Sequence, residues 1–257
     1  MPTPGRLEPK MTEITCVYSR TAAGRHILAF TADLWRRLGC SLPLQVQVHS
    51  DNDSATLQAK AVEKKLIKAD IAEKTGLPPE AISLTTAFQG DIIVDHNLAF
   101  QRQDLSILYP ARESTLLKRG QGPILVPFGD GQSALPAATM AYAMAARLSL
   151  PVVLYHTTWV DPQVTETEAK AHMCKSAQDV LSQLRAQAEE AGIEVTEVIE
   201  TADDVVEGLL NCAMRQSAVL IVMSRSAKTR IGCYVAQTLT KTPVPILALS
   251  SARRKQQ

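Results

Sequence analysis

Short apolar runs and amphipathic helical patterns alternate along almost the whole chain, and the series of alternations occurs twice. An apolar run at 14–19 (ITCVYS) precedes a helical pattern at 22–38, and a second run at 124–128 (ILVPF) precedes another at 135–148. Strands that alternate with helices form right-handed βαβ units, and these units build a parallel sheet with helices on both faces. The sequence therefore predicts an α/β fold.

Hydrophobic period and helix-ending glycines together predict the order of the elements. Gly39, Gly76 and Gly192 each follow a helical pattern, as expected of residues that end helices. Expected strands cover residues 14–19, 42–49, 82–88, 105–109, 124–128, 151–156, 193–199, 218–223 and 244–249. Expected helices cover residues 22–38, 54–75, 91–101, 135–148, 165–191, 203–215 and 231–239.

The two halves of the chain share their element order and several anchor residues. The matches include Leu38 with Leu148 and Pro43 with Pro151; His49 also matches His156. The run LSIL at 105–108 matches VLIV at 219–222, which makes it the fourth strand of its half. The segment after Tyr109 is too short for a further helix, strand and linker. The sequence thus predicts one domain at 12–121, truncated after its fourth strand, and a second at 122–251.

Composition excludes several classes of protein. The 257 residues carry 27 Lys and Arg against 26 Asp and Glu, a net charge of +1 that disfavours nucleic-acid binding. No apolar run approaches the roughly 20 residues of a membrane span, so direct membrane insertion is not expected. The cysteines at positions 16, 40, 174, 212 and 233 form no C-x-x-C pair, which predicts free thiols and a cytoplasmic protein.

Five segments of the second half resemble the universal stress protein family, in family order. They are ILVPFGDGQSA (124–134), AEEAGIEV (188–195), ADDVVEGLL (202–210), LIVMS (220–224) and TPVPILAL (242–249). The resemblance implies two tandem adenine-nucleotide-hydrolase-like domains, each an open parallel sheet with helices on both faces. Family members usually pair through their last strand. Because the first half is predicted to end after its fourth strand, the edge of residues 244–249 is expected to be exposed and to favour a homodimer.

The loop that holds phosphates in ATP-binding members has no good counterpart here. Those members carry G-x-x-G, nine residues, then G-[ST], because glycines let backbone amides approach phosphates. In residues 224–233 only Gly232 matches, and Cys233 stands where Ser or Thr is expected. The sequence predicts that the usual ATP-binding loop is lost. The alternative is that Arg225 and the nearby Lys228 and Arg230 hold an anion by charge.

A candidate nucleotide site is nevertheless implied at the carboxyl ends of the second-half strands. In the family, an acidic residue after the first strand helps to hold adenosine, and Asp130 matches it. The alternative is that Asp130 or Ser133 caps the following helix. His156 is expected to have a structural role. The candidate site comprises Gly129, Asp130, Gly131, Val153, Ser224, Arg225, Gly232 and Cys233.

The favoured function is a non-enzymatic regulatory or binding module in the stress response, with no cofactor. Ser133 lacks the second glycine of G-x-S-x-G, and no S-G-G-x-D-S loop is present, so no catalytic residues are expected. No metal site is expected, because the histidines and cysteines lack partners at ligand spacing. The alternative is a sensor of ATP or AMP. Expected partners are a second copy, a regulatory protein or a membrane transporter.

Overall fold

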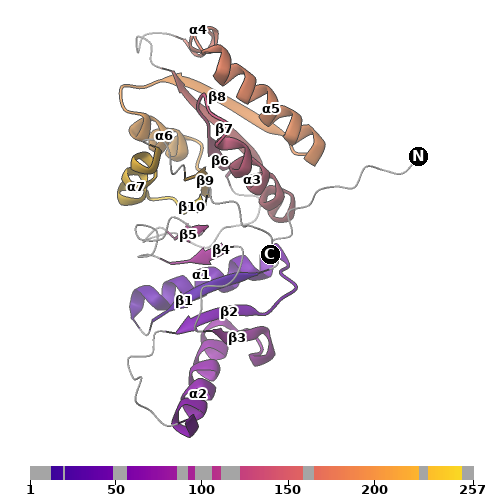
Figure 1. The fold of residues 1–257 in the computed structure, drawn as a ribbon, viewed down its shortest axis with the longest axis vertical. Helices are drawn as coiled ribbons and strands as arrows, with labels where there is room; N and C mark the ends of the chain where they lie inside the picture. Colours follow the sequence, from indigo (N-terminus) through magenta and orange to yellow (C-terminus); the bar gives the residue numbers. More distant parts are fainter. Residues whose placement is uncertain are drawn as a thin grey trace, which may run out of the picture.

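The computed structural model describes residues 13–19, 21–48, 57–85, 92–95, 106–110, 122–158, 165–225 and 231–250. One twisted sheet runs through the whole molecule, with helices packed along it (Figure 1). Its strand order is β3-β2-β1-β4-β5-β10-β9-β6-β7-β8. This mostly parallel sheet with flanking helices confirms the predicted α/β fold class.

The first half supplies five strands to this sheet. Its described elements are β1 (Ile14–Tyr18), α1 (Ala22–Leu38), β2 (Leu44–Val48), α2 (Leu57–Thr75), η1 (Pro79–Ala81), β3 (Ile82–Thr85), β4 (Ile92–Val94) and β5 (Ile107–Tyr109).

The second half also supplies five strands, and their spatial order repeats that of the first half. Its described elements are β6 (Ile124–Pro127), α3 (Ala134–Leu148), β7 (Val152–Thr158), α4 (Glu166–Ala171), α5 (Lys175–Ala191), β8 (Val195–Thr201), α6 (Val205–Arg215), β9 (Leu220–Ser224), α7 (Ile231–Lys241) and β10 (Ile246–Leu249). When the strands of each half are numbered from one, both halves read 3-2-1-4-5 across the sheet.

The expected truncation of the first half is wrong. The strand β4 lies inside the segment 91–101 that was predicted as a helix, and β5 is therefore the fifth strand of its half. Because β4 has only three residues, it shows no period that could distinguish a strand from a helix. Residues 91 and 96–101 of the predicted segment lie outside the described residues.

The edge of β10 is not exposed, which corrects the argument made for a homodimer. One side of β10 pairs in parallel with β9, and the other pairs antiparallel with β5. The antiparallel register places Ile246 opposite Tyr109 and Ala248 opposite Ile107. The last strands of the two halves thus pair within one chain.

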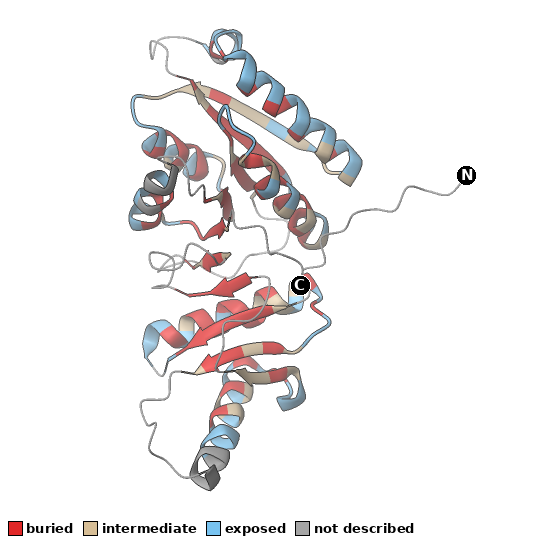
Figure 2. Ribbon diagram, in the orientation of Figure 1, coloured by how far each residue is buried: buried red, intermediate tan, exposed pale blue. Residues whose placement is uncertain are grey.

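A continuous core covers one face of the sheet along its full length. Side chains of α1, α2, α3 and α5 pack there against alternate residues of the strands, which appear as buried segments in Figure 2. Two glycines end helices of this layer as predicted. Gly39 (φ 62°) ends α1, and Gly192 (φ 67°) ends α5; both adopt the left-handed conformation that glycine favours.

The opposite face differs between the two halves. In the second half, α6 and α7 cover it, and the strands present mainly apolar side chains there, including Leu125, Val153, Tyr155, Val198 and Ile221. Alternation along the first-half strands places mainly polar side chains on this face: Thr15, Gln45, Gln47, Ser83 and Thr85. Only residues 86–91 separate β3 from β4, which leaves too little chain for a counterpart of α6.

One predicted helix is interrupted. Residues 165–191 were expected to form a single long helix, but α4 ends at Ala171 and α5 begins at Lys175. Thr165 and Glu168 form a reciprocal capping box that starts α4, while Cys174 is the N-cap residue of α5. The interruption turns the chain toward the carboxyl ends of the second-half strands.

Candidate functional site

A cavity of about 470 Å³ lies at the carboxyl ends of β6, β7 and β9. After β6, the chain continues to β7 on one side, whereas β9 lies on the other side of β6. In open α/β sheets, ligands bind outside the carboxyl ends of the strands where the winding direction changes. The cavity therefore occupies the position at which this fold class binds ligands, and its volume is typical of small-molecule sites.

The walls of this cavity come from separate parts of the second half. They include the loop after β6, the end of β7, the α4–α5 junction, the start of α6, the end of β9 and one side of α7. The lining residues are Pro127, Phe128, Gly129, Asp130, Ser133, Ala134, Tyr155, His156, Thr157, Thr158, His172, Cys174, Val205, Val206, Leu209, Met223, Ser224, Tyr234 and Thr238.

His156, near the end of β7, contacts Phe128 in the loop after β6 through a hydrogen bond and a stacked ring pair. Its Nδ1 lies 2.9 Å from the carbonyl oxygen of Phe128, and the two rings stack with their centroids 4.9 Å apart. Burial lowers the pKa of His156, although its bond to the Phe128 carbonyl and the charge of Asp130 act in the opposite direction. The ring is thus held neutral, with Nδ1 donating to the carbonyl. This contact fixes the loop that carries Asp130.

Three of the predicted site residues line the cavity: Gly129, Asp130 and Ser224. Ser133 also lines it and is the N-cap residue of α3, but its side chain makes no capping hydrogen bond. Ser133 thus takes the N-cap position that the alternative gave to Asp130 or Ser133, but not the hydrogen bond by which its side chain would cap the helix.

The other predicted site residues lie elsewhere. Val153 is 3% exposed and packs in the core beneath α6 and α7, on the same face of β7 as Tyr155 but two residues further from the carboxyl end of the strand. Gly131 and Arg225 do not line the cavity. Burial lowers the pKa of Arg225, whose backbone N–H donates to the carbonyl of Leu249. The backbone of Gly232 and Cys233 belongs to α7, but the surroundings of these two residues, like residues 226–230, lie outside the described part.

Several cavity residues were not predicted to belong to a nucleotide site. Thr158 ends β7 and is 6% exposed, and its Oγ1 is buried without a hydrogen-bond partner among the described residues. The buried Oγ of Ser224 is likewise unpartnered there. Buried hydroxyl groups normally have partners, so these two favour a polar ligand group. His172 and Cys174 reach the cavity only because the helix is interrupted between α4 and α5.

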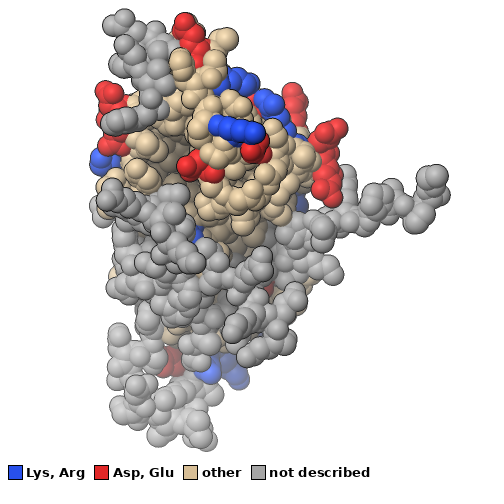
Figure 3. Space-filling view, turned by 45° about the horizontal axis from the view of Figure 1, so that its top comes forward, with Lys and Arg blue, Asp and Glu red and all other residues tan. Residues whose placement is uncertain are grey.

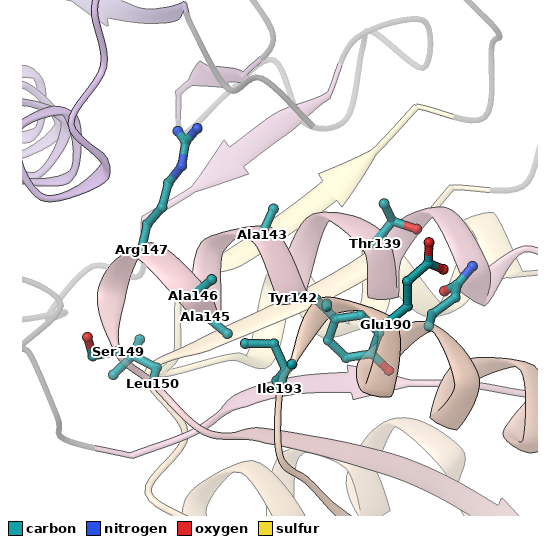
Figure 4. A pocket seen from close by; sticks show the side chains of 13 residues that line it. Thr139, Tyr142, Ala143, Ala145, Ala146, Arg147, Ser149, Leu150, Glu190 and Ile193 are labelled. Atoms are coloured by element: carbon teal, nitrogen blue, oxygen red, sulfur yellow. The ribbon is translucent and has the colours of Figure 1, made fainter. Parts of the chain in front are cut away.

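A second, larger cavity of about 550 Å³ lies between the carboxyl-terminal parts of α3 and α5 (Figure 4). Small apolar side chains of α3 form much of its wall, and Tyr142 already donates its hydroxyl to the carbonyl of Leu184 at 3.0 Å. The side chain of Arg147 points away from the labelled groups and donates to the carbonyl of Leu38 at the end of α1, 3.3 Å away. None of the predicted site residues lines this cavity.

The charged side chains on the face shown in Figure 3 are of both signs and are interspersed. Within the described ranges, no group of three or more His, Cys, Asp and Glu side chains is arranged to hold a metal ion. Among the helices of the described part, none has both the length and the apolar character that crossing a membrane requires.

Residues 122–247 match the model of the Universal stress protein family. This is the half that contains the cavity of Asp130 and His156, so the family resemblance is confirmed for that half. No curated protein matches the sequence.

Solved structures of universal stress proteins share the fold over most of the chain. A universal stress protein from Archaeoglobus fulgidus DSM 4304 has a TM-score of 0.72 and 13% identity, covering 95% of this chain and 100% of its own. A putative universal stress protein from Pseudomonas aeruginosa UCBPP-PA14 has a TM-score of 0.56 and 14% identity, covering 93% of each chain. The functionally unknown protein PA1789 from Pseudomonas aeruginosa PAO1 has a TM-score of 0.55 and 15% identity, covering 93% of this chain and 92% of its own.

Proposed function

We propose that the chain is a tandem universal stress protein and acts as a non-enzymatic, ligand-binding regulatory module in the stress response. The observation that carries the proposal is the cavity at the carboxyl ends of β6, β7 and β9, lined by Asp130. The family match over residues 122–247 supports a stress-related role for this half. The repeated 3-2-1-4-5 strand order supports a domain division near residues 121 and 122.

We propose AMP, rather than ATP, as the ligand. The cavity is large enough for a nucleoside, and Asp130 can accept hydrogen bonds from ribose hydroxyls. The buried hydroxyl groups of Thr158 and Ser224 offer further polar contacts. The described lining residues include no Lys or Arg. Because the loop at 224–233 retains only Gly232 of the family glycines, a triphosphate would find little compensation for its charge.

The proposed role in regulation does not include catalysis. Neither G-x-S-x-G nor S-G-G-x-D-S occurs at the strand ends where those nucleophile and phosphate loops operate. His156 uses Nδ1 to hold the carbonyl of Phe128, so this nitrogen serves the loop rather than a nucleophile. Turnover of ATP or AMP by the purified chain would contradict this part of the proposal.

Titration calorimetry with AMP, ADP, ATP and cyclic AMP tests the ligand. We expect AMP to bind with a Kd in the micromolar range and ATP to bind at least about tenfold more weakly, a difference of about 1.4 kcal/mol. Asp130→Ala should weaken AMP binding by about tenfold to a hundredfold, the effect of losing a charge-assisted hydrogen bond. The control Asp179→Ala, at an exposed position of α5, should leave the Kd unchanged. No heat with AMP at millimolar concentration would contradict the proposal.

The location and the partners of the module are also proposals. We place it in the cytoplasm, where the described free cysteines would stay reduced. A regulatory protein or a membrane transporter remains the proposed kind of partner. A homodimer is still open to test by sedimentation, but pairing through β10 does not support it, because β10 already has two neighbours.

A further inference from the structure

We propose that Cys174 is a site of reversible thiol modification in the wall of the cavity, where a low-molecular-weight disulfide forms a mixed disulfide that excludes the ligand. The exclusion of AMP rests on the proposed function; the modification itself does not. The proposal begins with the break between α4 and α5, which places Cys174 in the same cavity wall as Asp130, His156 and His172.

Accessibility separates Cys174 from the other described cysteines. Cys174 is exposed, whereas Cys16, Cys40 and Cys212 are buried with at most 8% of their surface accessible. Burial raises the pKa of Cys16 to about 12 and that of Cys212 to about 11, so both remain protonated thiols at neutral pH. Because the thiolate is the nucleophile in disulfide exchange, these buried groups react slowly.

The surroundings of Cys174 favour its thiolate. The Sγ atom lies 3.2 Å from the hydroxyl oxygen of Ser176, which donates to sulfur once the thiol has ionised. This hydrogen bond, and after it the nearby backbone N–H of Ala177, lowers the pKa of Cys174. Partial burial and the charge of Asp130 oppose the effect. Cys174 also stands at the N-terminus of the 17-residue helix α5, whose dipole favours a negative charge there.

A second observation shows that the cavity is built to receive a polar molecule. Thr158 lies in the same wall, and only 6% of its surface is exposed. Its Oγ1 has no hydrogen-bond partner among the described residues. A tripeptide-sized thiol attached to Cys174 would take up much of the cavity of about 470 Å³. Such an adduct and a nucleotide therefore compete for one volume.

The exchange step balances without any further reactant. The Cys174 thiol loses its proton, and the thiolate sulfur attacks one sulfur of the disulfide R–S–S–R. The Cys174–S–S–R bond forms as the original S–S bond breaks. The leaving thiolate R–S⁻ takes up the proton that Cys174 released. A second thiol reverses the step by the same route.

Peptide mapping by mass spectrometry after treatment of the full chain with oxidised glutathione tests the modification. Among the four described cysteines we expect an adduct only on Cys174, reversed by dithiothreitol and absent from Cys174→Ser. Ser176→Ala should slow its formation about threefold to fivefold, because the thiolate loses a hydrogen bond. The matched control Ser182→Ala removes another exposed serine hydroxyl of α5, which donates to the carbonyl of Gln178, and should leave the rate unchanged.

Two results would overturn the modification site: an adduct that forms elsewhere with Cys174 unmodified, or a rate of adduct formation at Cys174 that Ser176→Ala leaves unchanged.

The competition between the adduct and AMP is measured separately. AMP at ten times its calorimetric Kd should slow the adduct about tenfold by mass action, and the purified adduct should not bind AMP. Selective modification of Cys174 without calorimetric AMP binding would contradict the proposed function while supporting the site. If the adduct binds AMP as tightly as the unmodified protein does, the claim that the mixed disulfide excludes AMP is contradicted.

Discussion

Leu247 of β10 lies directly opposite Leu108 of β5, in the antiparallel pair that joins the two halves of the sheet. Both side chains are 0% exposed and belong to the core that covers one face of all ten strands. The other neighbouring strands of the described sheet run parallel to each other. The two leucines therefore mark the place where the first half and the second half become one folding unit.

We expect Leu108→Ala and Leu247→Ala each to lower the free energy of unfolding by about 2–5 kcal/mol, the cost of truncating a fully buried leucine. Because the two residues are paired neighbours, the double variant should deviate from additivity by at least about 0.5 kcal/mol. Urea denaturation measures these values. The control Leu66→Ala, at a residue of α2 that is 64% exposed, should change stability by under about 0.5 kcal/mol. Additive effects in the double variant would contradict the coupling.

Gly208 in α6 is required because the chain packs closely around it. A Cβ at this position would lie 2.6 Å from the hydroxyl oxygen of Tyr155 and 2.8 Å from the Cβ of Ala202. Alanine normally stabilises a helix relative to glycine, but here Gly208→Ala should destabilise the protein by about 1–3 kcal/mol through overpacking. Thermal unfolding should show no comparable loss for Gly131→Ala, where a Cβ meets no atom within 4 Å. An unchanged or increased stability of Gly208→Ala would refute this packing argument.

The stability of the ligand-free protein should fall at mildly acidic pH because of His156. Burial holds its pKa below the unfolded value of about 6.5, so the unfolded chain takes up a proton first as the pH falls. The stabilisation is complete above about pH 6.5 and is lost as the pH falls toward the lower pKa of the folded state.

Denaturation at about pH 7.5 and about pH 5.5 tests the assignment to His156. His156→Gln, which can still donate to the carbonyl of Phe128, should lose less stability over this range than the wild type. The exposed His172→Gln serves as the control and should lose as much as the wild type. Equal losses in all three proteins would show that another group titrates.

Glu197 on the edge strand β8 should stabilise the protein at neutral pH. It accepts hydrogen bonds from Arg185 and, at 2.7 Å, from Lys170, and these partners lower its pKa from 4.5 to about 2. Glu197→Gln should cost about 1 kcal/mol at pH 7, the upper range for a pair near the surface. The depressed pKa means that the difference shrinks as the pH falls from 4.5 toward about 2.

Chemical denaturation across this pH range checks the prediction. The exposed Glu194→Gln, three residues earlier in the chain, should cost less than about 0.5 kcal/mol at neutral pH. A cost for Glu197→Gln that persists undiminished near pH 2 would contradict the ion-pair explanation.

The long, strongly periodic elements of the fold could be predicted from sequence, because hydrophobic period and helix-ending glycines are local signals. The helix that ends at Gly39 and the buried strand β9 are examples. The three-residue strand β4 could not be predicted, since three residues are too few to distinguish the period of a strand from that of a helix. The pairing of β5 with β10 was not predicted either. It requires β5 to be the fifth strand of the first half, whereas the sequence predicts residues 105–109 as the fourth strand.

The candidate site was only partly predictable for a related reason. Asp130 follows a strand in a glycine-flanked turn, a signal that can be read from the sequence. Thr158 and Cys174 enter the cavity through the length of β7 and the break between α4 and α5, which tertiary packing determines. Val153 was wrongly included, because it lies further from the carboxyl end of β7 than the lining residue Tyr155 and is buried in the core.

Photolabelling with azidoadenosine monophosphate, followed by peptide mapping, tests the central claim that the second-half cavity is the ligand site. We predict light-dependent labelling of peptides that contain residues 127–134 or 155–158, suppressed by excess AMP and reduced in Asp130→Ala. Labelling confined to the first half or to the α3–α5 cavity, or labelling that excess AMP does not suppress, would contradict the claim.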